Sequence, residues 1–217
     1  MVTRLASERV NFATHFAGFL VWIPFTALLI YLTRARPDLV AVALVYGLGV
    51  LFLFFCSSWY HRHKRSENER TLWRTLDHFA IFVMIAASYT PVVWIWFDDP
   101  WRTVTLVFQW AVTLAGLAFK LFAHRAPRWV DPILYLLMGW VALLAIVPLY
   151  EKMPLPVFID LFGGGVWYTA GAIVYALKRP NFKPGVFGFH ELFHCFILGG
   201  AVTHGSMVLR SLVIAAQ

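Results

Sequence analysis

The chain alternates between long apolar stretches and short polar interruptions. Each apolar stretch has about 20 residues or more, which is the length that an α-helix needs to cross the hydrocarbon core of a bilayer. Clusters of proline and charged residues separate the stretches. The runs are too long and too uniformly apolar for barrel strands. The pattern therefore predicts an all-α fold, a seven-transmembrane helix bundle that forms one integral membrane domain over residues 1–217, with spans at approximately 11–33, 39–60, 73–97, 103–122, 130–150, 156–177 and 186–212.

Composition supports this prediction and sets the expected topology. Hydrophobic residues make up 60% of the chain and charged residues 13%, whereas soluble domains have about half and a quarter. Thirteen of the 18 Lys and Arg residues fall in the N-terminal tail and in the second, fourth and sixth loops. Cytoplasmic loops carry such an excess. We therefore expect a cytoplasmic N-terminus and an outside C-terminus, and we assign the net charge of +7 to topology, with no nucleic-acid partner.

The strongest candidate chemistry lies at the start of the last span. His190 and His194 are four residues apart, so on a helix both imidazoles lie on one face, about one turn apart. A helix offers two ligands to one zinc ion in this way. The alternative is a pair of hydrogen-bonded histidines near the membrane interface.

Two other spans bring polar residues to the same depth. The second span ends with Ser57 and His61, and the third begins with Asp77. The predicted topology places these ends at the cytoplasmic side, together with His190 and His194. Asp77 is suited to hold a metal-bound water or to orient a ligand imidazole, although a helix N-terminus also favours an acid. We expect His15 and His204 to make hydrogen bonds in the core.

The string from His190 to His194 also matches the HExxH motif of zinc metalloproteases, in which Glu191 would be the general base. Those enzymes usually take a third ligand from downstream. After His194 the chain contains no Asp or Glu, so an intramembrane metalloprotease would need a third ligand from upstream. This function remains a lesser alternative.

These motifs together resemble the hemolysin III-like branch of the progestin and adipoQ receptor (PAQR) family. The matching pieces are Ser57–His61, Leu76–Ile81 with Ser88–Pro91, and His190–His194 followed by Gly199–Ala201 and His204. The resemblance implies seven transmembrane helices, a cytoplasmic N-terminus and a Zn²⁺ ion held by His61, His190 and His194. It assigns Ser57 and Asp77 to the same site and does not make Glu191 a ligand.

The resemblance also bears on activity and location. This chain lacks the long N-terminal domain of the eukaryotic receptors, which favours a bacterial multi-pass protein of the inner (plasma) membrane. The family is similar to membrane hydrolases that include alkaline ceramidases. We therefore expect a zinc-dependent lipid amide or ester hydrolase that acts in membrane lipid homeostasis, with membrane lipids as partners, Asp77 as the base and Ser57 holding the oxyanion or water. The alternative is a receptor-like or membrane-perturbing, cytolytic protein with a structural zinc.

Overall fold

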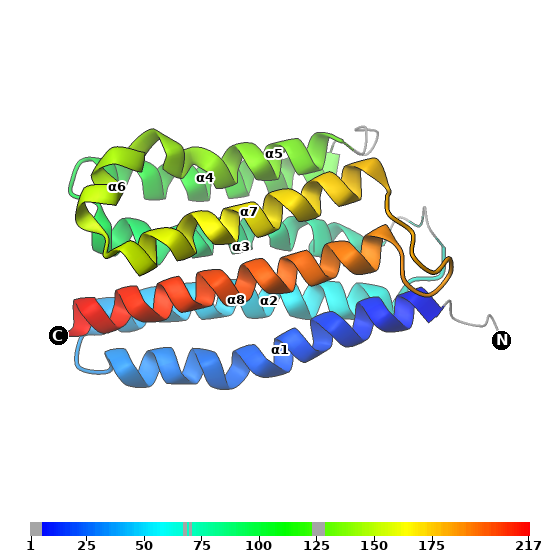
Figure 1. Ribbon diagram of the computed structural model, residues 1–217, viewed down its shortest axis with the longest axis horizontal. Coiled ribbons are helices and arrows are strands. Elements are labelled where there is room, and N and C mark those ends of the chain that lie inside the picture. The colour runs from blue at the N-terminus through cyan, green and yellow to red at the C-terminus, as the bar shows by residue number, and fades with distance from the viewer. Residues whose placement is uncertain (1–5, 67–68, 70, 123–128) are drawn as a thin grey trace.

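The computed structural model describes residues 6–66, 69, 71–122 and 129–217, and within them the fold is all-helical. Seven helical spans in this described part are long and apolar enough to cross a membrane, which confirms a multi-pass integral membrane protein. Figure 1 shows them as one bundle of roughly parallel and antiparallel helices. The elements are α1 (Ala6–Thr33), α2 (Pro37–His63), α3 (Leu72–Trp96), α4 (Trp101–Phe122), α5 (Val130–Gly139), η1 (Trp140–Ala145), α6 (Ile146–Lys152), α7 (Leu155–Leu177) and α8 (Phe189–Ala216).

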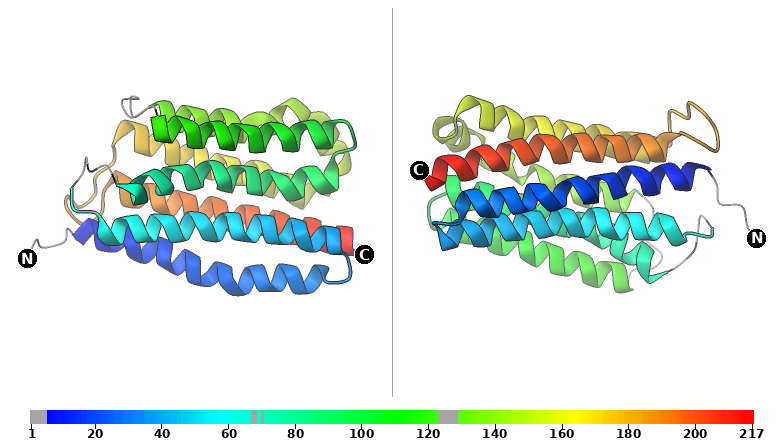
Figure 2. Two further views of the ribbon diagram at one scale, coloured as in Figure 1. Left: turned by 180° about the vertical axis from the view of Figure 1, so that it is seen from behind. Right: turned by 90° about the horizontal axis from the view of Figure 1, so that it is seen from below.

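The last helix closes the bundle. Helices α1, α2, α3 and α4 pack successively on one another, and α8 returns to contact α7, α1, α3 and α2. The start of α1 and the end of α8 lie at opposite ends of the bundle (Figures 1 and 2), as an odd number of spans requires. The start of α8 and the end of α2 consequently lie at the same end as the start of α1. This arrangement determines which polar residues meet.

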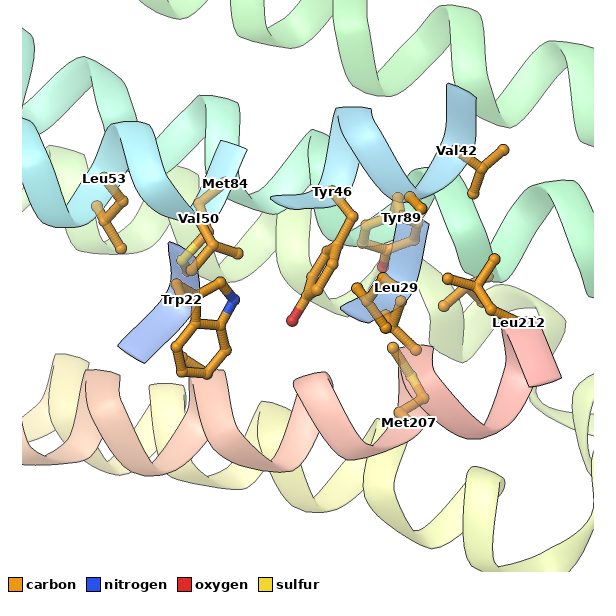
Figure 3. Close-up of a cluster of buried hydrophobic side chains, with 14 of the residues drawn as sticks. Trp22, Leu29, Val42, Tyr46, Val50, Leu53, Met84, Tyr89, Met207 and Leu212 are labelled. Atoms are coloured by element: carbon orange, nitrogen blue, oxygen red, sulfur yellow. The ribbon is translucent and has the colours of Figure 1, made fainter. Parts of the chain in front are cut away.

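The interior is apolar and tightly packed around α8. Buried side chains from α1, α2 and α8, including Leu29, Tyr46 and Met207, interlock there (Figure 3). At Gly49 a Cβ atom would lie 2.3 Å from the Cβ of Ala87, so the absence of a side chain lets α2 approach α3 closely. The outward faces are also apolar, because lipid covers them.

The fifth span differs from its prediction. A continuous helix over 130–150 was expected, but α5 ends at Gly139, and the 3₁₀ segment η1 separates it from α6. The hydroxyl of Tyr89 donates to the Gly139 carbonyl at 2.7 Å and accepts from the Ala142 amide at 2.8 Å. An irregular backbone at membrane depth needs such partners. The apolar pattern of span five did not predict the break after Gly139, because the break depends on Tyr89 from another helix.

Several helices extend beyond their apolar runs. Helix α1 already includes Ala6 and α2 continues to His63, whereas the corresponding apolar runs cover 11–33 and 39–60. The pattern marks only the segment inside the hydrocarbon core, while the helices continue past it. The extra residues of α1 include Glu8, which is buried in the bundle.

Candidate metal centre

Three histidines from two helices meet at the end of the bundle where α1 begins. His61 lies near the end of α2, and His190 and His194 lie on the first turns of α8. One ring nitrogen from each falls within 4.8 Å of the others. His61 and His194 are 1% and 2% exposed, so their imidazoles are withdrawn from lipid and water. The structure therefore brings together the three predicted ligands as a group that could hold a metal ion.

The spacing of one pair of these nitrogens fits a tetrahedral metal. The Nε2 atoms of His61 and His190 lie 3.3 Å apart. Two imidazole nitrogens bound to one zinc at about 2.0–2.1 Å and at the tetrahedral angle are separated by about 3.3–3.4 Å. Three clustered imidazole nitrogens form a donor set that suits zinc, and also other borderline metals. The residues present thus fit the metal that the sequence implies.

A carboxylate that the sequence did not reveal supports His61. Its Nδ1 lies 2.7 Å from Oε2 of Glu8, and Oε1 of Glu8 accepts a hydrogen bond from Nζ of Lys64 at 2.5 Å. A carboxylate only accepts, so Nδ1 of His61 carries the hydrogen and Nε2 presents its electron pair toward His190. Metal-ligating histidines are commonly oriented in this way.

Helix α1 also packs against His194. The hydroxyl of Thr14 lies 3.5 Å from its Nδ1. The ring of His15 stacks flat on that of His194, with centroids 3.7 Å apart and planes 10° from parallel. The hydrogen-bonding role that the sequence predicts for His15 stays a prediction, while the register of α1 places its ring against another imidazole.

For His204 the prediction is confirmed, because its Nε2 lies 3.0 Å from the Leu161 carbonyl oxygen.

Glu191 has a structural position that does not suit a general base. Its Oε1 accepts a hydrogen bond from the Asn11 side chain at 2.7 Å, and its Oε2 accepts from the backbone amide of Gly188 at 2.7 Å. The second contact caps the start of α8. Glu191 is not among the residues that line the cavity beside the histidines. This arrangement disfavours the HExxH metalloprotease.

A cavity of about 70 Å³ adjoins the histidines and is lined by Ser57, Asp77, His190 and His194, among others. The Ser57 hydroxyl lies against the Asp77 carboxylate. The Asp77 side chain is 16% exposed, and its Oδ2 lies 3.5 Å from Nδ1 of the neighbouring His78. Ser57 and Asp77 therefore line the cavity that His190 and His194 also line. An acid and a hydroxyl beside metal ligands in a small cavity can bind and deprotonate a water molecule.

Sequence reasoning missed the residues that α1 and α5 contribute. Glu8, Asn11 and His15 follow the i, i+3, i+7 spacing of one helix face, and that buried polar stripe was the available signal. Asp131 also lines the cavity, and its carboxylate pairs with Lys120. Its place at the start of an apolar run gave no sign of this.

A second, mostly apolar cavity of about 100 Å³ lies deeper between α3, α5, α7 and α8. It adjoins the first cavity, because six residues line both: Ile81, Met84, Tyr135, Ala172, Phe193 and Ile197. The polar site therefore lies next to an apolar space inside the bundle.

The chain is similar to known proteins over most of its length. The chain is 32% identical to hemolysin-3 of Bacillus cereus over 205 residues, which cover 92% of this chain and 90% of that protein. It is 31% identical to a hemolysin-3 homolog of Bacillus subtilis, with 91% and 90% covered. The ADIPOR-like receptor IZH2 of Saccharomyces cerevisiae is 26% identical, with 95% and 72% covered. The model of the haemolysin-III related family matches residues 3–205, and the chain belongs to that family.

Proposed function

We propose that this protein is a zinc-dependent hydrolase of lipid amides or esters, in which His61, His190 and His194 hold the metal. The observation that carries the proposal is the meeting of three imidazoles, two of which, His190 and His194, line one cavity together with Ser57 and Asp77. When bound there, zinc would polarise a substrate carbonyl and bring the pKa of a water molecule toward about 7.

The residues of the chain would divide the remaining work. Asp77 accepts the proton of the attacking water at its carboxylate, which lies on the cavity wall. The Ser57 hydroxyl, beside that carboxylate, positions the water or donates a hydrogen bond to the developing oxyanion. Glu8 holds the His61 ring in the tautomer that a metal ligand needs.

The adjoining apolar cavity indicates the kind of substrate. An acyl chain fits a space lined mainly by apolar and aromatic side chains, and its carbonyl end would then reach the polar cavity, since the two cavities share six lining residues. Membrane lipids supply such chains, and a role in membrane lipid homeostasis follows from this proposal.

The hydrolytic step can be tested with purified protein supplied with lipid amides and esters, with and without a chelator. We expect chelator-sensitive release of fatty acid. Asp77→Asn should keep its zinc and fold but lose about 10²-fold or more of the rate, the usual scale for a general base. Asp99→Asn, a change of the same kind at an exposed site at the other end of the bundle, should behave like the wild type.

Other outcomes would contradict the proposal. Full activity of Asp77→Asn with zinc bound would remove this carboxylate from the reaction. A wild-type protein that holds zinc tightly and hydrolyses none of these lipids would favour the receptor-like or membrane-perturbing alternative, in which the metal is structural.

We also propose that the metal centre faces the cytoplasm of a bacterial cell, in the inner membrane. At the end of the bundle that carries the centre, the described residues include nine Lys and Arg, against five at the other end. Arg4, Arg70, Arg125 and Arg128, which also entered the prediction, lie outside the described residues. This excess supports a cytoplasmic N-terminus by the positive-inside rule.

Thiol labelling can test this orientation in a Cys195→Ser background, because Cys195 is exposed whereas Cys56 is buried. An impermeant thiol reagent should label Asp99→Cys in intact cells. Ser66→Cys should be labelled only after the membrane is opened. The reverse pattern would place the metal centre outside.

A further inference from the structure

The apolar cavity between α3, α5, α7 and α8 contains two unpaired polar atoms. Ser88 Oγ and His204 Nδ1 are both buried, and neither has a hydrogen-bond partner within residues 6–66, 69, 71–122 and 129–217. Both residues line this cavity, and Ser88 is only 7% exposed. Leaving a buried polar atom unpaired is destabilising. The cavity therefore offers two polar atoms to whatever occupies it.

The hydrogen-bonding character of both atoms is defined. Nε2 of His204 lies 3.0 Å from the Leu161 carbonyl oxygen. Because a carbonyl only accepts, Nε2 carries the hydrogen and Nδ1 presents a lone pair. The Ser88 hydroxyl can donate and accept. A ligand hydroxyl that reaches both atoms would accept from Ser88 and donate to His204.

The position of His204 is built into the fold. A Cβ atom at Gly164 would lie 2.1 Å from Cδ2 of His204, so α7 has room for this ring only because residue 164 is a glycine. The edge of the Tyr168 ring packs against it, with centroids 5.3 Å apart. These contacts hold the imidazole in place at the cavity wall.

The two atoms lie at one depth relative to the metal centre. Ser88 follows Asp77 by 11 residues on α3, and His204 follows His194 by 10 residues on α8. At 1.5 Å per residue these separations are about 16 and about 15 Å along the helix axes. An extended chain advances about 1.2 Å per bond, so this depth equals roughly 12 or 13 bonds.

We propose that this cavity binds acyl chains that carry a hydroxyl group near the twelfth carbon, with Ser88 and His204 as its hydrogen-bond partners. The bond count rests on the proposed function, which places the carbonyl end of the chain at the metal centre. An unsubstituted chain fills the same space but leaves both atoms unpaired. Mid-chain hydroxylation thus becomes a determinant of specificity.

Equilibrium binding of free fatty acids tests the inference without any turnover. The probes are 12-hydroxystearate, stearate and 18-hydroxystearate, each competing with a fluorescent fatty acid for the purified full-length protein. We expect 12-hydroxystearate to bind about tenfold more tightly than stearate, which is the scale of a satisfied buried hydrogen bond. The 18-hydroxy isomer should gain nothing, because its hydroxyl lies beyond the two atoms.

Variants identify the partners. Ser88→Ala removes a hydroxyl that has no partner in the described residues, so it should fold normally and lower the preference to about threefold. Ser88→Ala combined with His204→Leu should abolish the preference and leave stearate binding intact. Ser58→Ala is the matched control, since that hydroxyl donates to the Phe54 carbonyl within α2.

The outcomes separate this inference from the proposed hydrolysis. Equal binding of 12-hydroxystearate and stearate by the wild type, or an unchanged preference in Ser88→Ala, would overturn the subsite whether or not the protein hydrolyses lipids. A clear preference without any hydrolysis would support the subsite and overturn only the enzymatic function.

Discussion

Glu8 is the sharpest test of the metal centre, because the structure assigns it a role that depends on His61 being a ligand. Its carboxylate accepts from Nδ1 of His61 at 2.7 Å and from Nζ of Lys64 at 2.5 Å. The side chain is only 9% exposed. The perturbation is Glu8→Gln, which keeps the size and one acceptor oxygen but removes the negative charge.

The expected loss follows from the geometry. A buried hydrogen bond to a charged group contributes about 1.5–3 kcal/mol, and loss of a carboxylate behind a ligating histidine costs about 10- to 100-fold in metal affinity. Those factors correspond to about 1.4–2.7 kcal/mol, so the two estimates agree. We expect Glu8→Gln to bind zinc about 10- to 100-fold more weakly than the wild type.

Competition between the purified protein and a zinc-binding dye measures this affinity. Asp38→Asn is the control, because its carboxylate pairs with Arg36 at the opposite end of the bundle, and its zinc affinity should equal that of the wild type. Thermal unfolding of the metal-free variants checks that both fold. A Glu8→Gln affinity within twofold of the wild type would refute the view that Glu8 orients His61 toward a metal.

The remaining predictions concern the ligands, the cap of α8 and the broken span. Alanine at any one of the three clustered histidines should abolish stoichiometric zinc, whereas His204→Leu should retain it; elemental analysis of the purified variants decides this. Glu191→Gln should retain zinc but lower the free energy of unfolding by about 1–2 kcal/mol, because the Gln side chain cannot accept from both the Asn11 side chain and the Gly188 amide. Loss of zinc in this variant would instead make Glu191 part of the metal site. Tyr89→Phe should destabilise the fold by about 1–3 kcal/mol in thermal unfolding, because it removes the hydroxyl that bridges the break in span five. The exposed Tyr31→Phe should change little, and equal stability of Tyr89→Phe and wild type would show that the break needs no such bridge.

The sequence by itself determined the number of spans and much of the centre. Long apolar runs force helices because lipid offers no hydrogen bonds to the backbone. The spacing of His190 and His194 places both on one helix face, and an odd number of antiparallel spans brings the end of α2 to the start of α8. The position of His61 beside His190 and His194 therefore follows from the order of the spans and from the four-residue spacing of the two histidines, and both can be recognised in the sequence.

Tertiary structure alone decided the contacts that depend on how helices far apart in the sequence are aligned against one another. The contact between Glu8 and His61 joins residues 53 positions apart, and it exists only because α1 continues past its apolar run and packs on α2. The stacking of His15 on His194 and the bridge from Tyr89 across the break after Gly139 have the same origin. Hydrophobic periodicity states which face of a helix is buried, whereas packing of one helix on another determines the residue that each polar group meets.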